Sequence, residues 1–238
     1  MNPLITKLER RDRLSDDERR ALQDAIARVR EVDARADIVQ QGSRPTESCL
    51  VLEGFAARYK VTETGKRQIT AVHVPGDFVD LHSLLLKVMD HGVLALTPCK
   101  VALVPHDALR RITDDHPHLS RLLWLSTLID GAIHREWLVA MGRLSAVERL
   151  AHLICEVFTR LDVIGLTDGT TFRFPLNQVE TADALGLSIV HVNRVLQELR
   201  GHGLLTWRGE VIAIEDVAAL KRFAQFDPTY LHLEREPR

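Results

Sequence analysis

Apolar and polar positions alternate most regularly in the segment 185–205, which reads LGLSIVHVNRVLQELRGHGLL. Four of its apolar residues recur at i, i+3, i+4 and i+7, namely Val192, Val195, Leu196 and Leu199. This spacing places them in one stripe along a helix, with most of the residues between them facing the other way. The pattern predicts a helix over 188–200 that has one buried face and one largely polar face.

A second, shorter helix is predicted directly upstream, over 178–185, with Val179, Ala182 and Leu185 facing inward. Gly186 can adopt the left-handed conformation that ends this helix, and the Ser188 hydroxyl can cap the next one. Two helices joined by so tight a turn form a helix-turn-helix, in which the second helix enters the major groove of DNA. The alternative is an ordinary amphipathic hairpin whose polar face is only solvated.

The flanking segments favour DNA binding. Two short strands are predicted downstream, at 204–207 and 211–214, and a β-hairpin in this place is a wing. Upstream, Ser145 and Glu148 have the spacing of a capping box that opens a further helix. With a last helix near 217–226, the order is that of a winged helix-turn-helix. The candidate DNA contacts are Gln178, Ser188, Ile189, Val190, His191, Asn193 and Arg194.

The N-terminal half has a different pattern. A helix over 15–30 is predicted first, with Ser15 and Glu18 as its capping box. Short strands then alternate with glycines whose separations are 12, 11 and 11 residues: Gly42, Gly54, Gly65 and Gly76. The predicted strands lie at 49–54, 55–61, 67–74 and 93–105, with a short helix at 81–89. Such spacing is typical of an antiparallel roll or sandwich, so a jelly-roll-like β-roll is expected.

A long helix is predicted between the two halves, from about 117 to 141. Apolar residues on more than one side suggest that one side packs on its own domain and another on a second copy of the chain. The expected dimer seam consists of Leu122, Leu125, Ile129 and Ala132. The alternative is a single helix buried inside one compact domain. Gly142 and Arg143 then form a candidate hinge.

These elements define an α+β protein in three parts. Residues 1–115 are expected to form a sensor-like β-roll, residues 116–142 the dimerisation helix, and residues 143–238 the winged helix-turn-helix domain. A chain of 238 residues with 45% hydrophobic residues can bury the cores that this division requires.

The amino-acid composition limits the classes of protein to which the chain can belong. The net charge of −2 provides no general attraction to nucleic acid, so any DNA affinity must come from a local basic surface. No apolar run reaches membrane length and no signal peptide is evident, so a cytoplasmic protein is expected. Cys49, Cys99 and Cys155 are isolated, which argues against a disulfide framework or a structural zinc site.

Catalytic and metal motifs are not found in the sequence. A nucleophile elbow and a glycine-rich phosphate loop are both missing, so an enzyme is not expected. His73, His82 and His91 recur at intervals of nine residues, but they lack the i, i+4 helical spacing of many metal-binding pairs. No metal site is therefore expected.

The ordered set of elements resembles the Crp/Fnr superfamily of bacterial transcription regulators over nearly the whole chain. VPGDFVDL at 74–81 is similar to the family's Gly-Asp/Glu-Phe turn, and Gly186-x-Ser188-x5-Arg194 to its recognition-helix pattern. IAIEDVAAL at 212–220 looks like its closing strand and helix. The resemblance implies a homodimer that reads a roughly palindromic operator through 188–200, with double-stranded DNA and RNA polymerase as partners and no membrane.

Two departures from the family pattern affect specificity. Many members carry a Glu where this sequence has Val190, and Val can contact a thymine methyl but cannot accept a hydrogen bond from cytosine. The segment 79–96 contains no Arg, which the resemblance would require to hold a cyclic phosphate. Asp80, His82 and His91 are the candidate effector-pocket residues of this segment.

Dependence on cyclic AMP is accordingly not expected. An iron–sulfur cluster needs several clustered cysteines, and no Cys precedes Cys49. Nothing in the sequence supports haem, and the effector stays undefined. The alternative function is a small-molecule sensor module that uses the β-roll without binding DNA directly.

Overall fold

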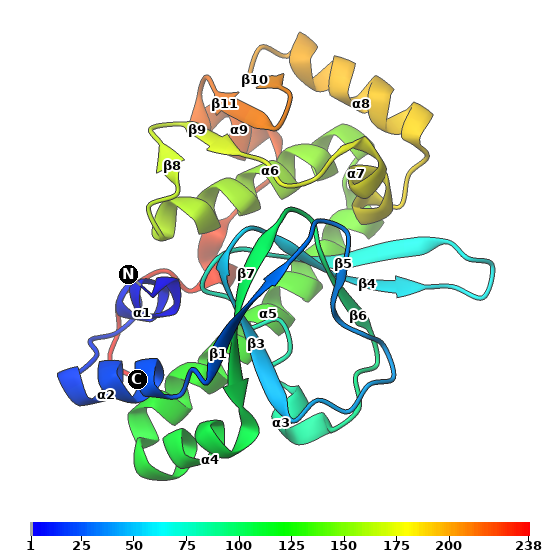
Figure 1. Cartoon of the computed structure of the whole chain (residues 1–238). Helices are drawn as coiled ribbons and strands as arrows, with labels where there is room; N and C mark the ends of the chain where they lie inside the picture. The colour runs from blue at the N-terminus through cyan, green and yellow to red at the C-terminus, as the bar shows by residue number, and fades with distance from the viewer. Residues whose placement is uncertain (1) are drawn as a thin grey trace.

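Two antiparallel sheets form the N-terminal half of the computed structural model, which describes residues 2–238 (Figure 1). The first sheet has the order β1-β7-β3 and the second β2-β6-β4-β5. Their bounds are β1 Arg28–Val32, β2 Asp37–Val39, β3 Glu47–Glu53, β4 Ala56–Val61, β5 Arg67–His73, β6 Gly92–Ala95 and β7 Cys99–Pro105. One cluster of buried side chains draws on both sheets, including Val51 and Val101 from the first and Ala56 and Val93 from the second. The predicted β-roll is confirmed.

The four glycines that mark the turns all have a positive φ, between 78° and 88°. Residues with a side chain rarely adopt this conformation. At Gly54 a Cβ atom would also lie 2.3 Å from the carbonyl oxygen of Pro98. The spacing seen in the sequence therefore reflects turns that need glycine.

Three predicted elements of this half differ in extent. Helix α2 (Asp16–Asp24) has the expected Ser15–Glu18 capping box but ends well before residue 30, because the chain from Arg28 pairs with β7 as a strand. The predicted strand over 93–105 divides into β6 and β7, which belong to different sheets. Helix α3 (Ser83–Leu86) is shorter than the predicted 81–89. Two further helices are α1 (Pro3–Glu9) and α4 (His106–Asp115).

Helix α5 (Pro117–Arg143) spans 27 residues and has two apolar faces, as predicted. The residues assigned to the dimer seam were wrong, however. Leu122, Ile129 and Ala132 are at most 6% exposed because they pack into cores of their own chain, and Leu125 is half-buried against the same cores. The exposed apolar residues of this helix are Trp124, Leu128, Leu138, Val139 and Met141.

The C-terminal half contains α6 (Ala146–Val163), α7 (Gln178–Leu185), α8 (Ile189–Gly201), α9 (Val217–Phe223) and the 3-10 helix η1 (Pro228–Leu231). Strands β8 (Thr167–Asp168), β9 (Thr171–Arg173), β10 (Leu205–Arg208) and β11 (Val211–Ile214) form one sheet in the order β10-β11-β9-β8. The Ser145–Glu148 capping box of α6 and the β10–β11 hairpin are confirmed. Strands β8 and β9 have only two and three residues and were not predicted from the sequence.

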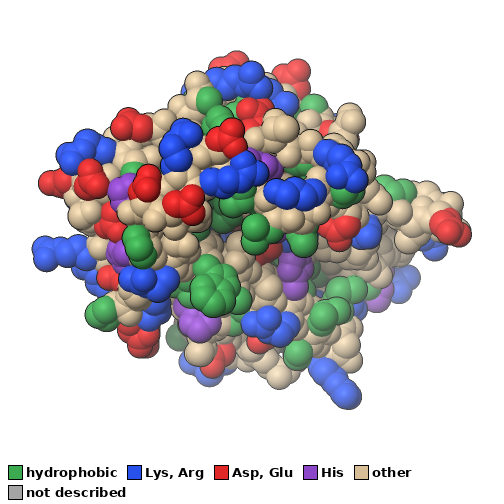
Figure 2. Space-filling view, turned by 90° about the horizontal axis from the view of Figure 1, so that it is seen from below, with side chains coloured by type: hydrophobic (Ala, Val, Ile, Leu, Met, Phe, Trp, Pro, Cys, Tyr) green, Lys and Arg blue, Asp and Glu red, His purple; other side chains and the backbone are tan. Residues whose placement is uncertain are grey.

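Charge is mixed over one face of the molecule. Seen from below, the molecule carries Lys and Arg side chains interspersed with Asp and Glu, with hydrophobic groups visible between them (Figure 2). This distribution agrees with the net charge of −2. Among residues 2–238, no helix combines the length and apolar character needed to cross a membrane.

The two halves are joined by a buried ion cluster. The carboxylate of Asp77, which follows β5, pairs with Arg160 of α6 and with Lys7 of α1. Arg160 also donates to the carbonyl of Val72 at 2.9 Å and to Glu156 at 3.1 Å. Asp77 is 4% exposed and Arg160 9%. One carboxylate thus connects the N-terminal helix, the β-roll and the first helix of the C-terminal half.

A second contact between the halves lies nearer the surface. The guanidinium of Arg67 on β5 donates to Asp183 of α7 at 2.8 Å, and the side chain of Gln68 donates to the carbonyl of Ala184 at 3.2 Å. Strand β5 therefore holds the first helix of the helix-turn-helix directly.

We expect Asp77→Asn to lower the free energy of unfolding at pH 7 by about 3–5 kcal/mol, because it leaves Arg160 and Lys7 buried beside a neutral group. Burial alone would raise the pKa of Asp77, but Lys7 and Arg160 hold it well below its ordinary value. The stabilisation is thus complete above about pH 4 and is lost as the pH falls through the folded-state pKa. Urea denaturation should show that the difference in free energy of unfolding between wild type and variant becomes smaller below that pH.

The exposed Asp168→Asn is the matched control, since it removes one carboxylate from the surface. If the difference in free energy of unfolding between wild type and Asp77→Asn were the same at all pH values, the assignment of the charged cluster would be contradicted.

Candidate nucleic-acid interface

The turn between α7 and α8 is fixed by local hydrogen bonds. The Asn177 side chain accepts from the amide of Glu180 at 2.9 Å and so caps α7, a capping box that the sequence analysis missed. Gly186 ends α7 with φ at 65°, in the left-handed region. The Ser188 hydroxyl then accepts from the amide of His191 at 3.2 Å and caps α8. The predicted capping roles of Gly186 and Ser188 are confirmed.

The two faces of α8 separate as its periodicity predicts. The apolar stripe is buried, with exposed fractions of at most 7%: Val192, Val195, Leu196 and Leu199. On α7 the inward positions Ala182 and Leu185 are confirmed, but Val179 is 48% exposed, so that part of the prediction was wrong. Thr181, one helical turn before Leu185, is buried on this helix instead.

The candidate DNA contacts form an uncovered surface. All are exposed in the structure: Gln178, Ser188, Ile189, Val190, His191, Asn193 and Arg194. Figure 1 shows α8 along the outer edge of the molecule, on the far side of α6 and α7 from the β-roll. Val190 is 66% exposed and Ile189 44%, although both are apolar. Exposed apolar groups at the start of a helix with this placement can contact thymine methyls.

Basic side chains flank this surface. Arg194 and Arg200 are exposed on α8, and Arg208 is exposed at the end of β10. The Arg200 guanidinium donates to the carbonyl of Trp207 at 3.1 Å, which fixes α8 to the wing. Arg208 was not among the predicted contacts, and its only signal in the sequence was a charge at the tip of the predicted hairpin. These cations supply the local basic surface that the chain's overall charge does not.

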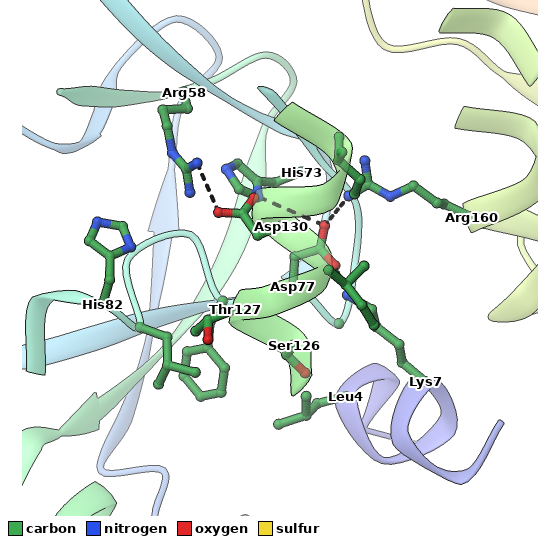
Figure 3. A pocket seen from close by; sticks show the side chains of 15 residues that line it. Leu4, Lys7, Arg58, His73, Asp77, His82, Ser126, Thr127, Asp130 and Arg160 are labelled. Atoms are coloured by element: carbon green, nitrogen blue, oxygen red, sulfur yellow. Dashed lines mark hydrogen bonds and ion pairs between the residues drawn. The ribbon is translucent and has the colours of Figure 1, made fainter. Parts of the chain in front are cut away.

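A separate cavity lies where the β-roll, α1, α5 and α6 meet (Figure 3). Its volume is about 50 Å³. Its charged and polar lining comes from Lys7, Arg58, His73, Asp77, His82, Ser126, Thr127, Asp130 and Arg160. Most of these residues were not predicted from the sequence as members of a site. Arg58 gave one usable signal, as a charge within the mostly apolar strand predicted at 55–61.

The Lys and Arg side chains of the cavity are already paired. Arg58 donates to Asp130 of α5 at 2.9 Å and lies 3.1 Å from the ring nitrogen Nε2 of His134. Burial raises the pKa of Asp130, but Arg58 and the neighbouring His73 and His134 together lower it by more, so the net shift is downward. Arg160 and Lys7 are paired with Asp77. A ligand in this cavity would have to compete with these pairs.

The three candidate effector residues do not converge on the cavity. His82 lines it, whereas Asp80 is fully buried and accepts a hydrogen bond from the amide of Cys49 at 2.6 Å. Burial raises the pKa of Asp80 to about 7. His91 lies beside His82, with ring centroids 5.1 Å apart, and its Nδ1 is 2.7 Å from the carboxylate of Asp90. Asp80 therefore has a structural role, since it holds β3 through a backbone contact.

The three cysteines lie in three different elements. Cys49, Cys99 and Cys155 are free and buried, in β3, β7 and α6 respectively. Burial raises the pKa of all three thiols. The raised pKa keeps each thiol in its neutral form, whereas the thiolate is the form that binds metals.

Comparisons with known proteins agree with this geometry. Residues 148–223 match the family model of the Crp-like helix-turn-helix domain, and residues 29–116 that of the cyclic nucleotide-binding domain. A probable transcriptional activator of Rhizobium leguminosarum bv. viciae is 30% identical over 176 residues, which cover 74% of this chain and 72% of that protein. The transcriptional activator protein FnrA of Stutzerimonas stutzeri is 26% identical over 200 residues, or 84% and 82% of the two chains.

A solved structure shares the fold. FixK2 from Bradyrhizobium japonicum superposes with a TM-score of 0.75 at 24% identity, covering 83% of this chain and 97% of that one. The β-roll, the long helix and the C-terminal helix-turn-helix therefore occur together in the same arrangement in a known protein.

The two faces of α8 should respond differently to substitution. Arg194→Ala removes an exposed side chain and should leave stability nearly unchanged. If Arg194 contacts a guanine, the loss should cost about 1–3 kcal/mol per half-site and relax specificity at one base position. Leu196→Ala should instead lower the free energy of unfolding by about 2–5 kcal/mol, because its side chain is buried. Urea denaturation and titration of labelled DNA at fixed salt measure the two effects.

Arg44→Ala serves as the control for lost surface charge, since Arg44 lies on the β-roll, away from α8. Wild-type DNA affinity in Arg194→Ala would remove Arg194 from the interface, and unfolding of that variant would place it in the core.

Proposed function

We propose that this chain, which belongs to the Crp/Fnr superfamily of DNA-binding transcription regulators, acts as a homodimer on a roughly palindromic operator. Its relatives are regulators and not enzymes. The observation that carries the proposal is the division of α8 into a buried apolar stripe and an uncovered face containing Arg194. RNA polymerase is the further partner that a regulator of this kind requires, and the cytoplasm is where it meets its operator. Residues 1–115, 116–142 and 143–238 are the proposed sensor, dimerisation and DNA-binding parts.

The exposed face of α5 supports dimerisation. Its residues follow a 3-4 spacing through the whole helix: Arg121, Trp124, Leu128, Gly131, Arg135, Leu138 and Gly142. This is the spacing of the a and d positions of a coiled coil, filled here by three large apolar residues, two arginines and two glycines. Trp124 is 65% exposed, Leu128 53% and Leu138 71%. A second copy of α5 would cover these side chains, and the two small glycines allow close approach of the backbones.

Two-fold symmetry determines how such a dimer meets DNA. Each protomer presents one α8, and helices of this type bind half-sites about 34–36 Å apart, one turn of the duplex. The operator should therefore be close to palindromic. Val190 and Ile189 favour thymine in each half-site, and Arg194 favours guanine.

The cavity supports activity without cyclic AMP. Its volume of about 50 Å³ is far below the roughly 300 Å³ or more of typical small-molecule pockets. Arg58, the cation of β4 that could face a phosphate, is paired with Asp130. A cyclic nucleotide would have to break that pair and enlarge the cavity.

Leu128→Arg should convert the dimer into a monomer, because it places a charge in an apolar interface. Sedimentation velocity measures the change directly. Operator affinity should fall together with dimerisation, since one half-site then has to be bound without the other. Leu166→Arg, which alters an exposed Leu outside α5, is the matched control. A Leu128→Arg variant that stays dimeric would show that this face of α5 is not the interface.

Selection of bound duplexes from a random DNA library tests whether the chain binds DNA in a sequence-specific way. We expect palindromic sequences with half-sites one helical turn apart, and weaker binding as salt rises. Recovery of no preferred sequence would favour the sensor module that does not bind DNA directly.

Cyclic AMP at millimolar concentration should neither raise the melting temperature nor change affinity for the selected operator. A ligand that binds the folded form must stabilise it by mass action. A saturable rise in melting temperature would show that the cavity opens for the nucleotide and that the pairing of Arg58 with Asp130 does not exclude it.

A further inference from the structure

Two histidines and a carboxylate that lie apart from the DNA interface come together next to the cavity. One ligand atom from each of His82, Asp90 and His91 lies within 4.8 Å of the others. His82 immediately precedes α3, and Asp90 and His91 immediately precede β6. A short helix and a turn lie between the two histidines and bring them together, although they are nine residues apart in the sequence. The sequence did not indicate this, because the spacing is not that of two ligands on one helix.

Both histidines have an unused nitrogen. The Nε2 atoms of His82 and His91 are buried and, within the described residues, have no hydrogen-bond partner. His91 is only 7% exposed. A buried polar atom that gives up its contact with water and gains no partner destabilises the fold, and an imidazole nitrogen in this state keeps a lone pair or a proton for a further partner.

His118 provides a contrast within the same chain. Its Nδ1 lies 2.7 Å from Glu18 and its Nε2 3.1 Å from Asp12. Both nitrogens are occupied by carboxylates, which leaves none for another ligand. Proximity to acidic groups alone therefore does not distinguish the two sites, whereas the free nitrogens of His82 and His91 do.

The surrounding backbone holds the two histidines in place. Met89 is fully buried, its amide donates to the carbonyl of Ser43 at 3.0 Å, and its own carbonyl accepts from Gly42 at 2.7 Å. Gly92 packs against Tyr59 so closely that a Cβ atom would lie 2.5 Å from the ring. Asp90, by contrast, has a side chain that is 71% exposed.

We propose that His82, His91 and Asp90 bind one zinc-type divalent cation, with water in the remaining coordination position. Two imidazoles and one carboxylate suit Zn²⁺, which takes three protein ligands and a water at open sites. Ligand atoms around tetrahedral zinc lie about 3.4 Å apart, given bonds of about 2.0–2.2 Å. The Asp90 carboxylate lies 2.7 Å from Nδ1 of His91, and to bind the cation its exposed side chain exchanges this contact for the metal. Of the two cations on β4, Arg58 is balanced by Asp130 at 2.9 Å, and Lys60 lies on the same strand.

Zinc titration of the full-length chain, without an affinity tag and after removal of metals with a chelator, tests the proposal. Competition with a chromophoric chelator should give one zinc per chain. Asp90→Asn and His82→Ala should each weaken binding by about 10-fold or more. Co²⁺ should bind at the same stoichiometry and develop visible absorption bands typical of low coordination number.

The controls are Asp114→Asn, an exposed carboxylate on α4, and His116→Ala, a half-buried histidine 3.9 Å from Asp17. Both should bind zinc as wild type does. If His82→Ala fails to fold by circular dichroism, Asp90→Asn decides, because its side chain is exposed. Wild-type affinity in Asp90→Asn, or less than one zinc per chain at micromolar metal, would overturn the proposal and leave the pair of rings as a packing contact.

Discussion

The carboxylate of Asp77 is the interaction on which the arrangement of the molecule depends. It neutralises Arg160 and Lys7 where water is excluded, and each of these three side chains comes from a different part of the chain. A buried charge without its partner is far more costly than a lost contact at the surface. The β-roll and the helix-turn-helix therefore keep one relative orientation as long as this cluster remains paired.

The cavity occupies the same junction, and this has consequences for signalling. Asp77, Arg160 and Asp130 all line it, so a molecule that entered would contact the β-roll, α5 and α6 together. Helix α6 packs against α8, and the stripe of Val192 and Leu196 ties α8 into the same core. A change in pairing at the cavity can thus alter the placement of the exposed face of α8 that we propose contacts DNA, because α6 contacts both the cavity and α8.

Features that depend on residues close together in the sequence were predicted correctly, whereas contacts between separate segments were not. The stripe of α8, the Ser145 cap and the turn glycines follow from rules that act within a few residues, so the sequence alone was enough. The exposed face of α5, which we propose as the dimer face, was not predicted because it includes Arg121, Arg135 and two glycines, while the more apolar face belongs to the chain's own core. The residues around the cavity come from separate segments, and only folding places Arg58 beside Asp130.

The pair between Arg67 and Asp183 gives ionic strength two roles in this molecule. It is partly exposed, so dissolved salt screens it, and it holds α7 against β5. Salt also weakens the attraction between basic side chains and DNA phosphates through counterion release. If α7 rearranges on DNA binding, rising salt makes that rearrangement easier, because it screens the pair between Arg67 and Asp183. The same rise in salt weakens the binding of DNA phosphates. The slope of log affinity against log salt concentration therefore underestimates the number of phosphates neutralised whenever α7 has to leave the sheet.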